Sequence, residues 1–402
     1  MSFKMKHQIG VCMLTGVFYP EISGGGLQCR TLIDSLKGKG IIFFVLTTTR
    51  DDSLKDFKSD VNVIRIVIKE LNLAGRFKAF LQFTRAFLKL QKQIDVVHLH
   101  GFSDKTLLII LLAKIFRKKI IQKITSLGDD DPISISQKRF GWIKKFLFNR
   151  ADLFISINPI ILKACLDSNI SESKVLIIPN AVDTKRFYPS NDLSEKQALR
   201  SELNLPIDGS IILFVGFFSK DKGPDILFEA WRKLKNQTQQ NNVRLLFIGS
   251  TDTSYFEIKF DLVKKIKDNI KAHGMEKEVF FVEKALQIEK YYKASDIFVL
   301  PSLREGLPNA LLEAMSAALP CISSDLKGIT DYLISDKKEG LIFAPGDIEG
   351  LCKAICALLN DKNMAKELGR NAREKILDKF SIDKVSRQYQ YVYDKLTKDN
   401  KC

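Results

Sequence analysis

Two carboxylates, Glu305 and Glu313, offer the clearest chemistry in the sequence. They lie in the segment 294–320, which begins with a short apolar run at 297–300 and breaks at Pro301. Glu305 is therefore expected on a loop after a strand, and Glu313 one turn inside a helix that starts at this loop. A helix amino end favours an anion such as a diphosphate, and neighbouring carboxylates can bind neutral sugar hydroxyls. The segment thus outlines a nucleotide-sugar site.

The residues between the two carboxylates rule out one continuous helix. Gly306 and Pro308 interrupt the helical pattern, and Asn309 is a plausible N-cap for the helix that follows. The loop is therefore expected to turn Glu305 back over the helix start.

A run of three glycines, Gly24, Gly25 and Gly26, follows the first apolar strand and precedes an expected helix at 27–36. Glycines let the backbone approach a phosphate closely and point N–H groups at it. The run is not a G-x-G-x-x-G fingerprint, because the loop before it is too long, and this disfavours a dehydrogenase.

Two lysines occupy a similar position later in the chain. Lys220 and Lys222 follow the strand that Gly216 ends, and Gly223 with Pro224 begins the next helix. A lysine at such a loop can neutralise a leaving diphosphate as a point charge. The alternative is a surface lysine, and the spacing favours the functional interpretation for Lys222.

Composition indicates a globular two-domain protein. The chain has 402 residues, 45% hydrophobic and 27% charged, and its longest apolar run, at 106–115, is too short to cross a bilayer. The first twenty residues are interpreted as a buried strand and not as a signal peptide. Seven unpaired cysteines suit a reducing compartment, and Cys352 and Cys356 are expected to be buried thiols and not zinc ligands.

The net charge of +16 implies an anionic partner. Two segments without acidic residues, 76–92 and 137–150, have the pattern of basic amphipathic helices suited to an anionic membrane surface. The alternative is that their apolar faces pack on a sheet, and this is the expected place of most of their phenylalanines.

Alternating strand-like and helix-like periods predict an α/β protein with two Rossmann-like doubly wound domains. The expected domains are 1–188 and 189–380, with a C-terminal helix within 381–402 packing back on the first, and loops of both facing a cleft. The expected strands are 8–14, 41–47, 61–68, 96–100, 120–124, 153–157 and 175–178, then 211–215, 244–248, 279–282, 297–300, 321–323 and 340–343.

The motif PSLREGLPNALLEAM, with its E-x7-E spacing, resembles the signature of family 4 glycosyltransferases of the retaining GT-B class. Supporting motifs follow in the family's order along nearly the whole chain: the glycine run, DVVHLH at 95–100, IPNAVDTKRFYP at 178–189, VGFFSKDKG at 215–223 and GLIFAPGD at 340–347.

The resemblance implies a role for each matching residue. Glu305 would hold donor-sugar hydroxyls, Glu313 the nucleotide ribose, and Lys222 the departing diphosphate. Backbone N–H groups around Leu307 to Asn309, in the loop that contains Gly306 and Pro308, would cradle the diphosphate and sugar together with those of the glycine run. The donor phosphate would take the acceptor proton, so neither a protein base, nor a metal, nor a cofactor is expected.

Two positions depart from the family pattern. Phe217 stands where arginine is frequent, and Lys220 is expected to replace part of that arginine's charge. Leu127 stands where a histidine often meets the outer hydroxyl of the donor sugar. One hypothesis is a donor without a 6-hydroxyl, which equal turnover of a hexose and its 6-deoxy analogue would contradict. Ordinary variation within the family is the preferred explanation.

Other polar clusters receive structural interpretations. Asp129, Asp130 and Asp131 match a D-x-D metal motif formally, but a solvated acidic loop or an acceptor contact is expected there. His98 and His100 are expected to be structural.

The sequence therefore predicts a cytoplasmic glycosyltransferase, peripheral on the inner face of the membrane. It would move sugar from a nucleotide-diphosphate sugar to a hydroxyl of a glycan, expected to be lipid-linked, in surface polysaccharide or lipopolysaccharide synthesis, without a nucleic-acid partner. Two alternatives are a GT-B-fold nucleotide-sugar epimerase, which would need its own acid and base, and a non-catalytic nucleotide-sugar or glycan-binding protein.

Overall fold

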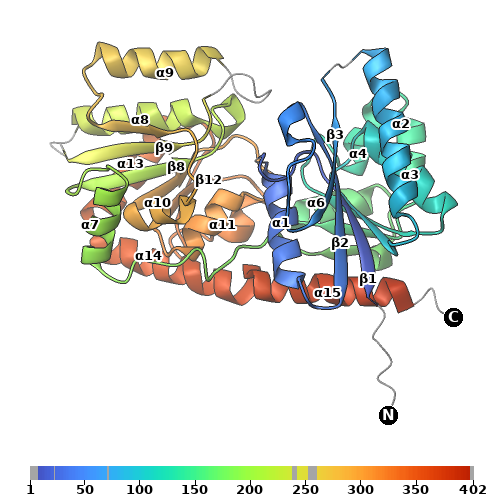
Figure 1. The fold of residues 1–402 in the computed structure, drawn as a ribbon. Helices are drawn as coiled ribbons and strands as arrows, with labels where there is room; N and C mark the ends of the chain where they lie inside the picture. The colour runs from blue at the N-terminus through green and yellow to red at the C-terminus, as the bar shows by residue number, and fades with distance from the viewer. Residues whose placement is uncertain (1–7, 22, 70–71, 238–241, 252–259, 399–402) are drawn as a thin grey trace. The chain divides into compact units, whose positions relative to one another are not determined.

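The fold is known from a computed structural model, which describes all residues except 1–7, 22, 70–71, 238–241, 252–259 and 399–402 (Figure 1). The chain divides into two compact units. Unit 1 contains Met1–Ala181 together with Ile382–Cys402, and unit 2 contains Val182–Ser381.

The boundary between the units lies before the expected one at residue 188. Phe187 is buried in unit 2, where its carbonyl oxygen accepts hydrogen bonds from the Ser316 hydroxyl at 2.6 Å and from Arg373 at 3.2 Å. Residues 182–188 therefore belong with the second sheet, because their polar backbone is satisfied there.

Unit 1 is built on a seven-stranded parallel sheet with the order β3-β2-β1-β4-β5-β6-β7. Every strand expected from the apolar runs is present, with ends shifted by at most two residues. The strands are β1 Ile9–Leu14, β2 Ile41–Thr49, β3 Asn62–Val67, β4 Val96–His100, β5 Lys119–Ile124, β6 Leu153–Ser156 and β7 Val175–Ile177.

Helices cover both faces of this sheet, as crossover connections between parallel strands require. They are α1 Gly24–Leu36, α2 Leu73–Leu90, α3 Asp104–Ile115, α4 Pro132–Gln137, α5 Gly141–Phe148, α6 Pro159–Asp167 and the C-terminal α15 Ile382–Lys398, with short η1 Asp52–Leu54 and η2 Glu172–Lys174.

Unit 2 repeats the design with a six-stranded parallel sheet of order β10-β9-β8-β11-β12-β13. Its strands are β8 Ser210–Val215, β9 Val243–Ile248, β10 Val279–Val282, β11 Ile297–Leu300, β12 Cys321–Ser324 and β13 Leu341–Phe343. Its helices are α7 Leu193–Glu202, η3 Lys220–Lys222, α8 Pro224–Gln237, α9 Phe260–Ala272, α10 Ile288–Ala294, α11 Asn309–Ser316, α12 Thr330–Leu333, α13 Ile348–Asn360, α14 Lys362–Lys375 and η4 Ile376–Phe380. The predicted α/β class is confirmed.

The strand orders fix where each sheet can bind a ligand. In unit 1 the direction of winding reverses between β1 and β4, and in unit 2 it reverses between β8 and β11. Loops leaving the carboxyl ends of such neighbouring strands run to opposite faces, which opens a crevice above the sheet. The glycine run follows β1, and Lys222 and Glu305 follow β8 and β11.

The helix α15 completes the core of unit 1 from the far end of the sequence. Its Val385, Tyr389 and Tyr393 are buried with residues of β1 and β4, and Figure 1 shows α15 passing across the lower ends of α1 and β1. The hydroxyl of Tyr393 lies 2.8 Å from Nδ1 of the fully buried His98. Burial holds the pKa of His98 well below its usual value, so the ring is neutral in this core.

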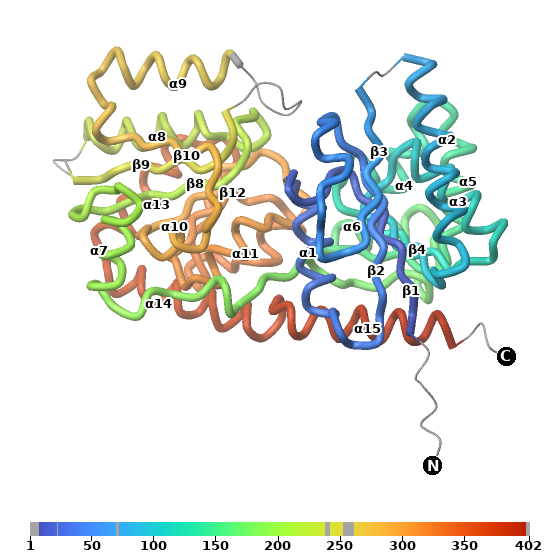
Figure 2. Tube along the Cα trace, viewed as in Figure 1, coloured from blue at the N-terminus to red at the C-terminus, as the bar shows by residue number. Residues whose placement is uncertain are grey.

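The helices α2, α3 and α5 lie together on one side of unit 1 (Figure 2). The expectation that most phenylalanines of α2 pack inward holds for half of them. Phe83 and Phe87 are buried, whereas Phe77 and Phe80 are 63% and 48% exposed. The helix therefore presents apolar side chains to solvent as well as to the core.

The second basic segment is not a single helix. It begins at the end of α4, turns at Phe140, whose φ is +58°, and continues as α5 with Trp142 77% exposed. Within the described residues, none of the helices is long and apolar enough to cross a membrane.

Candidate functional site

An ion pair between Lys222 and Glu305 lies at the centre of the candidate site. Nζ of Lys222 is 2.8 Å from each carboxylate oxygen of Glu305, and the Glu305 side chain is only 6% exposed. The Ser302 hydroxyl donates a further hydrogen bond to Oε1 at 2.7 Å. The two loops singled out from the sequence therefore meet, and their opposite charges are in direct contact.

Backbone contacts hold these two loops together. The carbonyl oxygen of Asp221 accepts hydrogen bonds from the N–H groups of Leu303 at 2.7 Å and Arg304 at 3.3 Å. Gly223, at φ +63°, packs so closely on the Pro301 carbonyl that an added Cβ would lie 2.3 Å from its oxygen. Glycine is required at this position both by the backbone angle and by the contact.

Glu313 lies in α11, but it contacts a different partner. Its Oε2 accepts a hydrogen bond of 2.8 Å from the hydroxyl of Tyr292 in α10. Burial raises the pKa of Glu313 to about 7, while the Tyr292 hydrogen bond and the charge of Arg186 lower it. Glu313 therefore exchanges its proton near neutral pH.

The start of α11 differs from the expected one. Asn309 is the first helical residue and Pro308 is the N-cap, so the expected capping by the Asn309 side chain is wrong. Proline is compatible with this place because its backbone angle suits a helix entrance, and it has no N–H to satisfy. Leu307 is buried, and Gly306 is partly exposed between it and Glu305.

Lys220 and Phe217 do not join the ion pair in the same way. Lys220 is exposed at the first position of η3, and Phe217 is partly buried against the core of unit 2. Phe217 therefore serves the packing of this loop, and the charge that remains at the carboxyl end of β8 comes from the two lysines.

In unit 1 the glycine run has a different conformation from the one expected. Gly24, Gly25 and Gly26 form the first turn of α1, which the Ser23 hydroxyl caps by accepting from the Gly26 N–H at 3.0 Å. The expected helix start at Leu27 is wrong, since the serine cap supports the helix three residues earlier. An added Cβ on Gly26 would lie 2.5 Å from the Val17 carbonyl oxygen, so this turn packs tightly on the loop before it.

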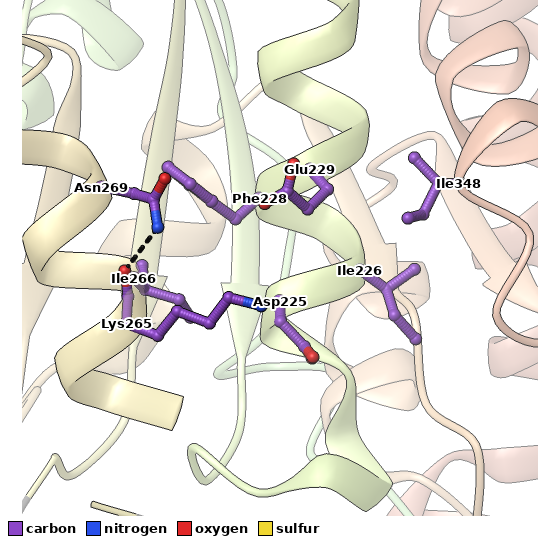
Figure 3. Close-up of a pocket in the computed structure, with 8 residues that line it drawn as sticks. All are labelled: Asp225, Ile226, Phe228, Glu229, Lys265, Ile266, Asn269 and Ile348. Carbon is purple, nitrogen blue, oxygen red and sulfur yellow. Dashed lines mark hydrogen bonds between the residues drawn. The ribbon is translucent and has the colours of Figure 1, made fainter. Parts of the chain in front are cut away.

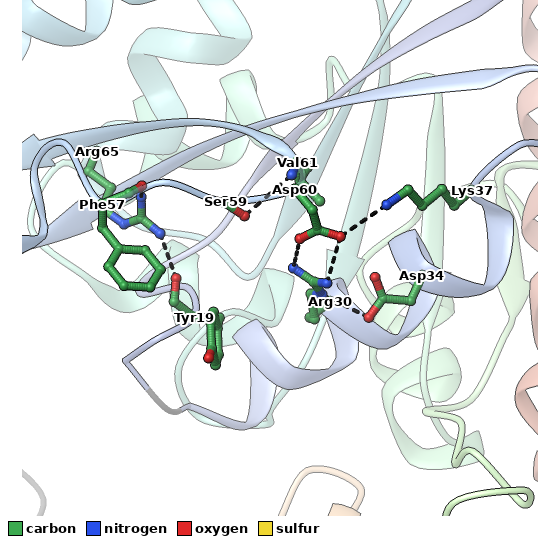
Figure 4. Close-up of polar contacts among 9 residues, drawn as sticks. All are labelled: Tyr19, Arg30, Asp34, Lys37, Phe57, Ser59, Asp60, Val61 and Arg65. Carbon is green, nitrogen blue, oxygen red and sulfur yellow. Dashed lines mark hydrogen bonds and ion pairs between the residues drawn. The ribbon is translucent and has the colours of Figure 1, made fainter. Parts of the chain in front are cut away.

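Two arginines anchor α1 and its preceding loop (Figure 4). Arg30 binds the carboxylate of Asp60 with both terminal nitrogens, at 2.7 and 3.0 Å. The buried Arg65 donates to the carbonyl oxygens of Tyr19 at 2.5 Å and Phe57 at 3.1 Å. Planar guanidinium groups with several donors are suited to such double contacts. The loop after β1 is thereby tied to the strand at the sheet edge.

Two of the three consecutive aspartates have structural roles. Asp130 and Asp131 are 3% and 2% exposed, so the expected solvated loop is wrong for both. Asp130 accepts from the N–H groups of Thr125 and Ser126, and Asp131 caps α4. Their oxygens satisfy backbone donors that would otherwise be buried without partners.

Metal ligands are not clustered in the described part of the chain. Cys352 is buried and Cys356 partly buried, in line with their expected packing role. His98 and His100 share one face of β4 with ring centroids 4.3 Å apart, and burial lowers the pKa of His100 to about 3. Both histidines are therefore neutral components of the core.

A cavity of about 190 Å³ opens between α8 and α9 (Figure 3). Its lining mixes Asp225, Glu229 and Lys265 with apolar side chains. Figure 3 shows Phe228 and Lys265 extending into the gap between α8 and α9, with Ile226 and Ile348 on the other side of α8. None of the residues predicted for the site lines this cavity, so it adds nothing to the Lys222–Glu305 centre.

Sequence reasoning missed three contributors to the site. Ser302 lies two residues after the end of β11, and its polar type near a strand end was an available signal. Tyr292 and the Asp221 carbonyl gave no signal, because their roles depend on long-range contacts across 21 and about 80 residues of sequence.

Two protein-family models together match most of the chain. A family model described as Glycosyl transferases group 1 matches residues 195–375, and one described as Glycosyltransferase Family 4 matches residues 22–186. The first match contains Lys222, Glu305 and Glu313, and the second contains the glycine run.

Similar proteins belong to the same class. The chain is 22% identical to N-acetyl-alpha-D-glucosaminyl L-malate synthase of Bacillus anthracis, covering 99% of each chain. It is 26% identical to an Escherichia coli galactosyltransferase named as acting from UDP-Gal on GlcNAc-diphosphoundecaprenol, over 88% of this chain and 83% of that protein. The structure of Anabaena HepE in complex with UDP-glucose superimposes with a TM-score of 0.78 at 17% identity, covering 96% and 100% of the two chains.

The contact of Gly223 with Pro301 gives a test of how the two loops are held. Gly223 and Gly274 have the same φ of +63°, but an added Cβ at Gly274 meets nothing within 4 Å. We expect Gly274→Ala to lower the free energy of unfolding by about 1 kcal/mol from backbone strain alone, and Gly223→Ala by about 3 kcal/mol. Denaturant unfolding followed by the buried Trp231, with Trp142→Phe as background, measures both.

Equal losses for the two alanine variants would contradict the steric role of Gly223. The comparison isolates that role, because the backbone penalty is shared and only the contact differs.

Proposed function

Since the chain belongs to the group 1 glycosyltransferases and transfers sugar from a nucleotide-sugar donor, we propose that it is a retaining enzyme whose donor site is centred on Lys222 and Glu305. The ion pair of these residues, at the carboxyl ends of the adjoining strands β8 and β11, is the observation that carries the proposal. A cation and a carboxylate held together at the switch point of the sheet support a site for the diphosphate and the sugar of a donor.

Each residue has a distinct role in this proposal. Glu305 accepts hydrogen bonds from donor-sugar hydroxyls, Glu313 accepts them from the ribose, and Lys222 faces the diphosphate. Lys220 adds positive charge nearby, and backbone N–H groups of Gly306, Leu307 and Asn309, beside Pro308 at the α11 entrance, approach the phosphates. Gly24, Gly25 and Gly26 remain predicted donor contacts.

The reaction requires little acid–base chemistry from the protein. The bond from the anomeric carbon to the diphosphate oxygen breaks, and its electron pair stays on the diphosphate. The acceptor hydroxyl oxygen bonds to the anomeric carbon on the same face, and its proton passes to a diphosphate oxygen. Lys222 stabilises the charge that develops on the leaving group, a contribution of about 3 kcal/mol for a well-placed donor. Chelation with EDTA is therefore expected to leave turnover unchanged.

The donor that we propose is a UDP-sugar, and the acceptor is a hydroxyl of a diphosphate-lipid-linked saccharide in surface polysaccharide synthesis. Support comes from the substrates in the name of the galactosyltransferase relative and from UDP-glucose bound to the similar fold. The net charge of +16 suits a donor and an acceptor that each carry a diphosphate.

Two other functions make different demands on the site. An epimerase of this fold would need an acid and a base at the sugar. In this chain Lys222 and Glu305 are instead joined in an ion pair. A silent binding protein would bind nucleotide sugar without releasing UDP. Release of UDP that depends on an added saccharide acceptor separates transfer from both.

Replacing the central carboxylate tests the proposed site. We expect Glu305→Ala to lower kcat by at least about 100-fold, because the donor sugar loses its hydroxyl partner and Lys222 loses its orientation. Release of UDP from a panel of nucleotide sugars, with and without polyprenyl-diphosphate-linked saccharide, measures this. Glu276→Ala is the matched control, since Glu276 is exposed beyond the opposite end of the sheet, before β10.

Turnover of Glu305→Ala at the parental rate would place the chemistry elsewhere. Thermal unfolding of both variants, compared with the parent, distinguishes a lost contact from a lost fold.

We further propose that unit 1 binds an anionic membrane surface through a basic aromatic face. This face consists of exposed apolar side chains of the neighbouring helices α2, α3 and α5, interspersed with exposed bases: Phe77, Phe80, Leu81, Leu88, Ile115, Trp142 and Phe146 with Lys78, Arg85, Lys89, Arg117 and Arg150. Apolar side chains enter the headgroup region while each base near anionic lipid adds about 1 kcal/mol. Such a position would bring the enzyme to a lipid-linked acceptor on the cytoplasmic side.

Sedimentation with lipid vesicles tests this face. We expect the parent to bind vesicles that contain phosphatidylglycerol, to bind phosphatidylcholine alone much less, and to dissociate as salt rises. The double variant Trp142→Glu, Phe146→Glu should lose most of the binding, because it places negative charge among the apolar anchors. Leu286→Glu is the control, since Leu286 is 93% exposed on unit 2.

Equal binding of the two vesicle types, or unchanged binding of the double variant, would contradict the proposed surface.

A further inference from the structure

We propose that Tyr292 is a positioning residue that orients the carboxylate of Glu313 toward the ribose of the donor nucleotide. The inference rests on the proposed function, which gives Glu313 the ribose, and adds the residue that makes this contact selective. Tyr292 would act only through Glu313, without touching the nucleotide.

The Tyr292 ring is fixed in place from several sides. It is fully buried in α10, and its centroid lies 5.7 Å from that of Phe187 and 6.0 Å from that of Phe298. The hydroxyl donates to Glu313 Oε2 at 2.8 Å and lies 3.3 Å from the Ala310 carbonyl oxygen. A buried tyrosine hydroxyl with such a partner has one available orientation.

The geometry leaves one oxygen of Glu313 for a ligand. Tyr292 occupies Oε2, and the part of the chain that the structure describes gives Oε1 no hydrogen bond. Glu313 itself is partly exposed whereas Tyr292 is not, so a ligand can reach the carboxylate without reaching the tyrosine. A carboxylate held by one oxygen presents the other at a fixed angle, as a ribose diol requires.

The hydrogen bond also favours the charged form of the carboxyl. Burial raises the pKa of Glu313, and the Tyr292 hydroxyl and the Arg186 charge oppose this effect, whereas Glu289 adds to it. Arg186 is itself paired with Glu289 at 2.8 Å. Other charged or titratable groups lie on the elements packed around Glu313. Arg373 of α14 donates a hydrogen bond to the Ser316 carbonyl, and burial raises the pKa of the Cys321 thiol in β12. Asp378 and Lys379 of η4 are exposed. The Tyr292 hydroxyl is thus the neutral group that lowers the pKa of Glu313 and opposes the effect of burial, so that the carboxyl exchanges its proton near pH 7.

Removing the single hydroxyl with Tyr292→Phe tests the inference. The probes are UDP and its dideoxyribose analogue, titrated against the full chain by calorimetry. We expect the parent to prefer UDP, and the variant to lose about tenfold in UDP affinity while its affinity for the dideoxy analogue is unchanged. Tyr291→Phe is the matched control, the same change one residue earlier on α10.

A pH series gives a second readout that a packing defect would not reproduce. UDP affinity in the parent should rise with pH as Glu313 ionises around pH 7, and the midpoint should move to higher pH in Tyr292→Phe. Equal losses for both probes, or an unshifted midpoint, would overturn the positioning role.

The proposed function and this inference fail differently. If Glu313→Ala binds UDP as the parent does, the ribose assignment is wrong and the inference falls with it. If Glu313→Ala loses UDP affinity while Tyr292→Phe matches the parent for both probes, only the inference is overturned. Thermal unfolding of each variant verifies that the fold is retained.

Discussion

A nearly buried carboxylate, Glu305, has to be neutralised at the carboxyl ends of two adjoining strands of unit 2, and much of the local structure serves this need. Removing such a group from water is costly unless a partner is held close to it. Lys222 supplies the charge and Ser302 a hydrogen bond. The Asp221 carbonyl and the tight Gly223 turn keep the two loops in contact, so the charged pair is preorganised. In the proposed donor site, the sugar and the diphosphate would exchange partners with this pair without a change in the loops.

The second carboxylate follows a different principle. Glu313 accepts a hydrogen bond from the neutral Tyr292, and the charges of Arg186 and Glu289 act on it without a hydrogen bond. Its pKa therefore lies close to neutral pH. Two acids eight residues apart are thereby given different chemistry by their surroundings. Glu305 is tied to a cation, whereas Glu313 depends on one hydroxyl.

Much of the architecture was readable from the sequence, because apolar runs in parallel sheets are long and strongly patterned. All thirteen strands of the described residues were located from these runs, and the loops after β8 and β11, both singled out from the sequence, are in contact. Local caps were harder. Ser23 is the N-cap of α1, so that this helix begins at the glycines, and Pro308 instead of Asn309 is the N-cap of α11. Such caps depend on backbone angles that composition does not specify.

Burial of individual polar and aromatic side chains was also outside the reach of pattern alone. Asp130 and Asp131 looked like a solvated acidic loop and are buried acceptors of backbone N–H groups. Phe77 looked like a core residue and is exposed. In each case the outcome depends on which neighbours the tertiary fold brings, and these lie far away in sequence.

The docking of α15 on unit 1 has a consequence for how the chain is made. Unit 2 is one continuous stretch, Val182–Ser381, but the core of unit 1 includes Tyr389 and Tyr393, which are synthesised after it. During synthesis on the ribosome, all residues of unit 2 are made before α15. His98 of unit 1 can be buried against Tyr393 only after α15 has been made. We therefore expect the part of unit 1 before Val182 to remain incompletely packed until the last turns of α15 have been synthesised. This part should be the most dependent on chaperones during synthesis.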